Sequence, residues 1–204
     1  MTTIPHNSES LKEALAKKTA KIGIVGLGYV GLPLVQAFVE AGFPTLGFDL
    51  DESKISQLAS GQSYIQHVAS NWIKEALKQH RFEPISQMDR LSEADVILIC
   101  VPTPLTESRD PDLGYIESTG HQIASTLRPG QLVVLESTTY PGTTRDVLLP
   151  ILLSSGLQVG QDFFLAYSPE REDPGNQQFS AQGIPKVIGG IDAESLELAN
   201  LLYS

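Results

Sequence analysis

Short apolar segments alternate with helical patterns from residue 20 to the end of the chain. The apolar segments read KIGIVG, TLGFDL, DVILICV, QLVVLEST, DFFLAYS and KVIGG, and helical patterns follow them at 30–41, 51–59, 116–127, 142–153 and 192–203. Strands that are apolar on both faces and separated by helices are typical of a parallel sheet covered by helices on both sides. The sequence therefore predicts a doubly wound parallel α/β fold.

A glycine-rich turn, Gly26-Leu27-Gly28-Tyr29-Val30-Gly31, follows the first apolar segment and opens the first helix. Gly26 permits a tight turn, Gly28 lets the backbone approach a pyrophosphate, and Gly31 lets helix and strand pack closely. Asp49 ends the next strand, where a carboxylate can accept both hydroxyls of an adenine ribose. This pattern predicts a Rossmann-type dinucleotide site, and the charge of Asp49 beside Asp51 favours NAD over NADP. The alternative is a purely structural strand-to-helix turn.

Composition excludes several classes of function. The 204 residues hold 14 Lys+Arg against 24 Asp+Glu, a net charge of −10, which disfavours nucleic-acid or anionic-membrane partners. Residues 1–90 hold nine basic and nine acidic side chains, whereas residues 91–204 hold five and fifteen. A single cysteine, Cys100, allows no disulfide framework, and the four scattered histidines suggest no metal site. No apolar run approaches the roughly 20 residues of a membrane span, and we expect a cytoplasmic protein.

Two proline-rich loops, 101–114 and 168–185, come directly after predicted strands. Ligands of open parallel sheets bind at this carboxyl edge, so functional residues are expected in these loops. Residues 1–19 are an N-terminal extension in which 8–18 could form a short amphipathic helix or a frayed tail, and residues 20–204 form the Rossmann-type domain. We expect Tyr64, Trp72 and Tyr115 to pack rather than to stack on a ligand.

Several motifs together resemble the N-terminal NAD-binding domain of the UDP-glucose/GDP-mannose dehydrogenase family. They are GLGYVGLPL, FDLDESKI, CVPTPL, ESTTYPGTT and SPEREDPGN, in register over about residues 20–204. SYIQHV and PEREDPGN are similar to the branch that oxidises UDP-N-acetylhexosamines. The resemblance implies oxidation of the sugar C6 alcohol to a carboxylate in two NAD-dependent steps, for surface polysaccharide precursors. Family members hold the intermediate aldehyde on a cysteine as a thiohemiacetal, which becomes a thioester that water hydrolyses.

The resemblance also implies roles for individual residues. The cofactor-binding residues would be Gly26, Gly28, Tyr29, Val30, Gly31, Asp49, Lys54, Thr103 and Thr138; the catalytic residues would be Thr138 and Glu170, acting on the hydrolytic water; Glu170 and Arg171 would contact the substrate. Each has a simpler alternative: Lys54 could be a solvated charge, Thr103 a turn residue, Thr138 a strand-end residue, Glu170 one acid among many, and Arg171 a partner in a loop salt bridge.

Cys100 ends the apolar segment DVILIC, where a cysteine normally behaves as a small buried hydrophobe. It does not match the nucleophile of the family, which belongs to a second, substrate-binding domain. We therefore expect that domain to be absent from this chain, which alone would bind NAD but turn over little, while the full-length protein would be a homodimer. Alternatives are half of a UDP-glucose or GDP-mannose 6-dehydrogenase, a free-standing NAD-binding module without catalysis, and a relative of 6-phosphogluconate or 3-hydroxyacid dehydrogenases.

Overall fold

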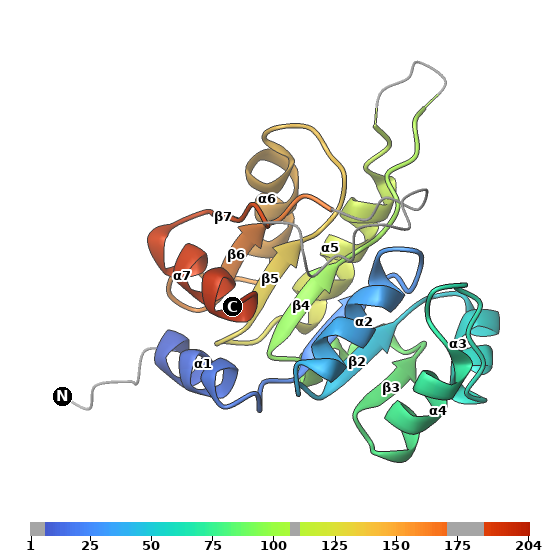
Figure 1. The fold of residues 1–204 in the computed structure, drawn as a ribbon. Coiled ribbons are helices and arrows are strands. Elements are labelled where there is room, and N and C mark those ends of the chain that lie inside the picture. Colours follow the sequence, from blue (N-terminus) through green and yellow to red (C-terminus); the bar gives the residue numbers. More distant parts are fainter. Residues whose placement is uncertain (1–6, 107–110, 171–185) are drawn as a thin grey trace.

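The computed structural model describes residues 7–106, 111–170 and 186–204. A seven-stranded sheet runs through its centre in the order β3-β2-β1-β4-β5-β6-β7, with helices on both sides (Figure 1). The first six strands of this order are mutually parallel. The order 3-2-1-4-5-6 is that of the Rossmann fold, so the predicted doubly wound α/β architecture is confirmed.

The elements have the following bounds. The strands are β1 Ile22–Val25, β2 Thr45–Phe48, β3 Phe82–Ile85, β4 Val96–Ile99, β5 Leu132–Leu135, β6 Phe164–Tyr167 and β7 Gly189–Gly190. The α-helices are α1 Asn7–Ala16, α2 Gly31–Glu40, α3 Glu52–Ala59, α4 Ser70–Lys78, α5 Gly114–Thr126, α6 Leu149–Leu153 and α7 Ala193–Leu202. A 3-10 helix, η1, spans Met88–Glu93, and a π-helical turn, η2, spans Thr143–Leu148 and leads into α6.

Alternate residues of the central strands enter two separate hydrophobic cores. In β4, Val96 and Leu98 belong to the core shared with α1, α2, α4 and α7, whereas Ile97 and Ile99 belong to the core shared with α5, α6 and η1. Successive side chains of a strand point to opposite faces, so a strand buried on both sides must be apolar throughout. This explains why the strand segments read as continuous apolar runs.

The order of strands reverses between β1 and β4. The chain leaves β1 for β2 on one side and later returns to place β4 on the other side. The loops after these two strands therefore diverge and leave a crevice at the carboxyl edge, which is where ligands of such sheets bind.

Two parts of the fold differ from the sequence predictions. Nothing was predicted for residues 60–94, which form α4, β3 and η1. Strand β3 contains Pro84, which is tolerated because β3 is an edge strand. Strand β7 was expected to be parallel but pairs antiparallel with β6. A parallel neighbour needs a crossover connection, usually a helix, and the proline- and glycine-rich 168–185 segment has no helical pattern.

The N-terminal segment forms the helix α1, which is the first of the two alternatives that the sequence left open. Leu11 and Leu15 of α1 are buried in the core, and Lys12 forms ion pairs with Glu194 (Nζ···Oε1 2.8 Å) and Glu197 (Nζ···Oε2 2.9 Å) of α7. Helix α1 therefore packs against the last helix of the described chain (Figure 1). None of the helices in the described part of the chain is long and apolar enough to cross a membrane.

Candidate cofactor-binding site

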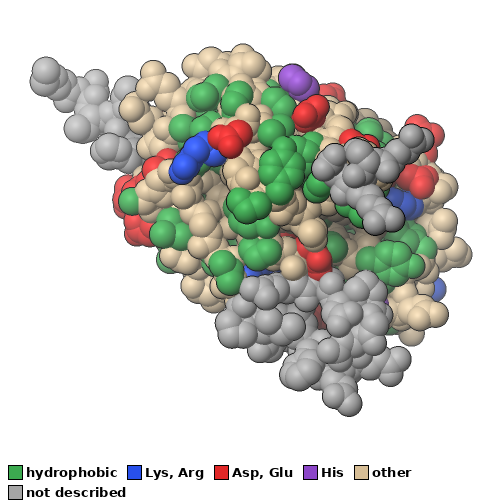
Figure 2. All heavy atoms as spheres, turned by 90° about the horizontal axis from the view of Figure 1, so that it is seen from above, with side chains coloured by type: hydrophobic (Ala, Val, Ile, Leu, Met, Phe, Trp, Pro, Cys, Tyr) green, Lys and Arg blue, Asp and Glu red, His purple; other side chains and the backbone are tan. Residues whose placement is uncertain are grey.

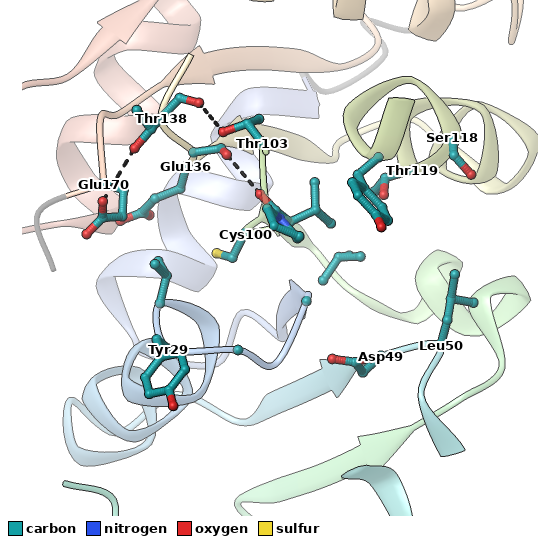
Figure 3. Close-up of a pocket in the computed structure, with 18 of the residues that line it drawn as sticks. Tyr29, Asp49, Leu50, Cys100, Thr103, Ser118, Thr119, Glu136, Thr138 and Glu170 are labelled. Carbon is teal, nitrogen blue, oxygen red and sulfur yellow. Dashed lines mark hydrogen bonds between the residues drawn. The ribbon is translucent and has the colours of Figure 1, made fainter. Parts of the chain in front are cut away.

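A pocket of about 550 Å³ lies at the carboxyl edge of the sheet, over the crevice between β1 and β4. Residues that come after five different strands line it. Gly26, Asp49, Cys100 and Glu136 directly follow β1, β2, β4 and β5, and Glu170 lies in the loop after β6. Asp49 and Leu50 lie at one end, and Thr103, Thr138 and Glu170 at the other (Figure 3). The pocket thus joins residues that are far apart in the sequence.

The glycine-rich turn after β1 also lines this pocket. Gly26 has φ +93°, and a Cβ built on it would lie 2.8 Å from the carbonyl oxygen of Cys100. A Cβ on Gly31 would lie 1.8 Å from the carbonyl oxygen of Gly26, so only glycine fits there. By contrast, a Cβ on Gly28 would meet no atom within 4 Å, although Gly28 lines the pocket. Gly26 and Gly31 shape the turn, and Gly28 leaves open space where a ligand can approach the backbone.

Helix α2 begins directly after this turn. Its N-cap residue, Val30, makes no side-chain hydrogen bond to the helix, and both Tyr29 and Val30 line the pocket. The N-terminal N–H groups and the dipole of a helix attract anions. The turn and the helix therefore fit a diphosphate.

Asp49 is only 8% exposed, and three donors hold its carboxylate. The N–H of Leu27 and the ammonium of Lys54 both donate to Oδ2, each at 2.9 Å, and the N–H of Asp51 donates to Oδ1 at 2.9 Å. Lys54 thus pairs with Asp49 instead of standing alone as a solvated charge. Because Leu27 belongs to the glycine-rich turn, Asp49 also ties β2 to that turn.

Tyr64 contacts the same turn from the other side. Its hydroxyl donates to the carbonyl oxygen of Leu27 at 2.7 Å, and its ring packs against the core. Burial, with the nearby charges of Asp49 and Asp51, raises the pKa of Tyr64, so the phenol keeps its proton and stays a donor. The predicted packing of Tyr64 and Trp72 is confirmed. The same prediction is wrong for Tyr115, which is 53% exposed and lines the pocket, because the start of α5 faces the crevice.

Thr103, Thr138 and Glu170 meet at the other end of the pocket (Figure 3). The Thr103 hydroxyl donates to the backbone carbonyl oxygen of Thr138, and the Thr138 hydroxyl donates to Oε2 of Glu170 at 3.5 Å. The other carboxylate oxygen of Glu170 is buried and has no hydrogen-bond partner among the described residues. A buried carboxylate oxygen without a hydrogen-bond partner destabilises the folded state. This oxygen is therefore suited to accept a hydrogen bond from a water or a ligand.

A buried cluster lies behind this end of the pocket. Glu136, which is 2% exposed, accepts hydrogen bonds from Lys186 at Oε1 and from the Tyr203 hydroxyl at Oε2, the latter at 2.6 Å. The Lys186 ammonium also lies 4.5 Å from the centroid of the Tyr203 ring. Burial, and secondarily the charge of Glu136, raises the pKa of Tyr203, which therefore stays a neutral donor.

Cys100 lies next to this cluster and is 7% exposed. Burial is the main cause that raises the pKa of its thiol, and the charge of Glu136 adds to it. The thiol therefore stays protonated at neutral pH and is a poor nucleophile. This agrees with the prediction that Cys100 is a small buried hydrophobe.

The rim of the pocket is partly apolar. Figure 2 shows this face, where apolar side chains gather around acidic ones. Tyr29, Leu50 and Tyr115 are 61%, 65% and 53% exposed, and all three line the pocket. Exposed apolar side chains around a concave site are typical of a surface that a ligand covers.

Most of the predicted site residues share one pocket. Those that line it are Gly26, Gly28, Tyr29, Val30, Asp49, Lys54, Thr103, Thr138 and Glu170. Gly31 supports the turn from below, and Arg171 lies outside the described residues. No group of three or more His, Cys, Asp or Glu side chains in the described ranges is placed to hold a metal ion.

Comparison with known proteins places this geometry in a family. Residues 20–204 match the model of the "UDP-glucose/GDP-mannose dehydrogenase family, NAD binding domain". The chain belongs to this family. It is therefore an NAD-binding domain of the Rossmann type, and its pocket lies at the carboxyl edge of the sheet, where such domains bind their ligands.

Individual relatives agree with this assignment. Protein CapL of Staphylococcus aureus is 39% identical over 90% of this chain and 42% of its own length. UDP-N-acetyl-D-glucosamine 6-dehydrogenase of Pseudomonas aeruginosa is 36% identical over 91% of this chain and 43% of its own length. The crystal structure of NDP-N-acetyl-D-galactosaminuronic acid dehydrogenase from Methanosarcina mazei Go1 superposes with a TM-score of 0.85 at 33% identity, over 97% of this chain and 44% of that one. The chain thus spans less than half the length of these relatives.

Glu136, Lys186 and Tyr203 were not predicted as site residues. Glu136 carries the signal that identified Asp49, an acidic residue directly after an apolar strand, and could have been found on that ground. Lys186 and Tyr203 carry no local signal, because they lie 50 and 67 residues from Glu136 in the sequence.

Proposed function

We propose that NAD lies along this pocket with its adenosine at Asp49, its diphosphate over Gly28, and its nicotinamide between Thr103, Thr138 and Glu170. The observation that carries the proposal is the open space at Gly28. It lies in the same pocket as the buried Asp49 carboxylate and a carboxylate oxygen of Glu170 that has no hydrogen-bond partner in the described part of the chain. When bound, NAD accepts a hydride, and the residues of the chain bind and orient it. The pocket is large enough for much of a dinucleotide.

We propose further that the site prefers NAD to NADP. The carboxylates of Asp49 and Asp51 would repel a 2′-phosphate. Hydrogen bonds from Ser53 lower the pKa of Asp51, which keeps it ionised. Lys54 offsets part of the charge of Asp49, so the preference depends on both acids together.

The whole protein is proposed to be a nucleotide-sugar 6-dehydrogenase that acts on a UDP-N-acetylhexosamine. Two features support this: relatives of the chain are UDP-N-acetyl-D-glucosamine and UDP-N-acetyl-D-mannosamine dehydrogenases, and Glu170 of the SPER segment lies beside Thr138. In this role Thr138 and Glu170 would hold the water that completes the second step, and the unpartnered oxygen of Glu170 is placed to accept its proton. The roles of Arg171, the homodimer and the cytoplasmic location stay predictions.

The cofactor proposal is tested by calorimetry of the 204-residue chain with NAD and with NADP. We expect NAD to bind at least tenfold more tightly. Equal affinity for the two would refute the role assigned to the acidic pair.

The substrate proposal is tested with a protein that joins this chain to the remaining length found in its relatives. Each of UDP-N-acetylglucosamine, UDP-N-acetylmannosamine, UDP-glucose and GDP-mannose is supplied with NAD, and NADH formation is followed by absorbance. Oxidation of an N-acetylated sugar in preference to the others is expected. If NAD binds but no sugar is oxidised, the chain is an NAD-binding module without catalysis.

A further inference from the structure

In the cluster of Glu136, Lys186 and Tyr203, the acidic side chain lies nearest the pocket. Of these three side chains, Glu136 alone lines the pocket, whereas Lys186 and Tyr203 contact its carboxylate from behind. The negative end of the ion pair therefore faces the cavity and the positive end lies further away. Such a pair acts on a ligand as an oriented dipole with its negative end nearest.

Burial makes this dipole effective. Glu136 is 2% exposed at its side chain, and the side chain of Lys186 is 23% exposed. Charges that are shielded from water interact more strongly with a neighbouring ligand and are screened less by salt. A solvated surface pair would have little effect at the same distance.

The neighbouring groups do not cancel the negative charge. Burial keeps the Cys100 thiol and the Tyr203 phenol protonated, so neither adds charge. Glu170, at the same end of the pocket, carries an acidic side chain as well (Figure 3). Among the described residues at this end of the pocket, Lys186 is the cation paired with Glu136, so it determines how much of the negative charge of Glu136 acts on a ligand in the cavity.

The two redox forms of the cofactor differ in charge at this end. The oxidised nicotinamide ring carries a positive charge, and the reduced ring is neutral. A charge that lies near the ring therefore changes the relative affinity for the two forms without changing the contacts to the adenosine end.

We propose that Glu136 biases the site toward the oxidised form of the cofactor, and that Lys186 limits this bias while Tyr203 fixes the carboxylate in place. The inference rests on the proposed function, because it requires the nicotinamide to lie at the Thr138 end. It assigns Glu136 and Lys186 as residues that set redox-state selectivity, distinct from residues that bind the diphosphate or the ribose.

Three variants of the 204-residue chain separate charge from structure. Glu136→Gln removes the negative charge and keeps an amide of similar shape. Lys186→Met removes the positive charge and keeps the apolar stem. Tyr203→Phe breaks the cluster without changing any charge. Melting temperature and near-ultraviolet circular dichroism check that each variant is folded.

The measured quantity is the ratio of the affinities for NAD⁺ and NADH, from titrations at pH 8.5 and fixed salt. We expect Glu136→Gln to lower this ratio by about threefold or more and Lys186→Met to raise it by about threefold or more, while Tyr203→Phe leaves it within about twofold. A purely structural role would move both charge variants in the same direction.

The possible outcomes separate the two proposals. Opposite shifts in the two charge variants support the inference. If the unmodified chain binds both forms but the ratio does not move, or moves the same way in both, the inference is wrong and the proposed cofactor site stands. If the unmodified chain binds neither form, the proposed function fails and the inference fails with it.

Discussion

The two ends of the pocket are built in different ways. At the proposed adenosine end, the glycine-rich turn, Asp49 and Lys54 come from the continuous stretch of chain from β1 to the start of α3, and two backbone N–H groups and the Lys54 ammonium donate to the Asp49 carboxylate. At the proposed nicotinamide end, Thr103, Glu136 and Glu170 follow three different strands, and the hydrogen bonds that their side chains make with other described residues are donated by side chains. The arrangement of the Asp49 end therefore depends on local backbone geometry. The arrangement of the Glu170 end depends on which strands are neighbours in the sheet.

This difference predicts that glycine substitutions at the adenosine end have separable effects on folding and on binding. Gly31→Ala places a methyl group 1.8 Å from the carbonyl oxygen of Gly26, which forces the turn and α2 apart. We expect the free energy of unfolding to fall by about 3 kcal/mol or more, measured by urea denaturation. Gly28→Ala is the matched control, because its methyl group meets no protein atom within 4 Å. Equal losses in both variants would contradict the account of the turn.

Asp49→Asn tests the carboxylate at the adenosine end. Loss of the charge would weaken the proposed acceptor for the ribose hydroxyls, and it leaves the Lys54 ammonium without its ion-pair partner. We expect NAD affinity to fall about tenfold and the preference for NAD over NADP to shrink, because Lys54 can then meet a 2′-phosphate. Calorimetry with both cofactors measures this. As a control, Glu40→Gln removes an exposed charge at the end of α2 and should alter neither affinity. If Asp49→Asn keeps the same preference for NAD over NADP, the proposed ribose role of Asp49 is wrong.

Tyr203→Phe tests the side-chain network behind the nicotinamide end. Burial raises the pKa of Tyr203 in the folded state, so the folded chain holds this proton more tightly than the unfolded chain. The stability that the phenol contributes is therefore complete below its unfolded pKa of about 10 and is lost as the pH rises past that value. We expect the variant to be about 1 kcal/mol less stable than the unmodified chain at pH 8, with the difference shrinking toward pH 11. Cys100 has a raised pKa in both proteins and does not affect the comparison. A difference that stays constant over this range would contradict the buried donor.

The same contrast explains how much of the molecule was predictable from the sequence. Apolar runs and helical periodicity predicted the parallel strands other than β3, and the glycine spacing with Asp49 predicted residues that line the pocket, because these signals are local. Strand β3 was missed because Pro84 interrupts an otherwise short pattern. The antiparallel direction of β7 and the meeting of Glu136 with Lys186 and Tyr203 depend on which strands become neighbours, and a single sequence carries no direct signal for that. The family resemblance supplied Thr138 and Glu170 in place of such a signal.

The central claim, that a diphosphate lies over Gly28, is tested most directly by titrating NAD into the unmodified chain and into Gly28→Ala. The added methyl group would occupy the space that the ligand needs without meeting any protein atom. We predict that the unmodified chain binds NAD, and that the variant binds at least tenfold more weakly while its melting temperature stays the same. Equal NAD affinity in the two proteins would contradict the proposed site.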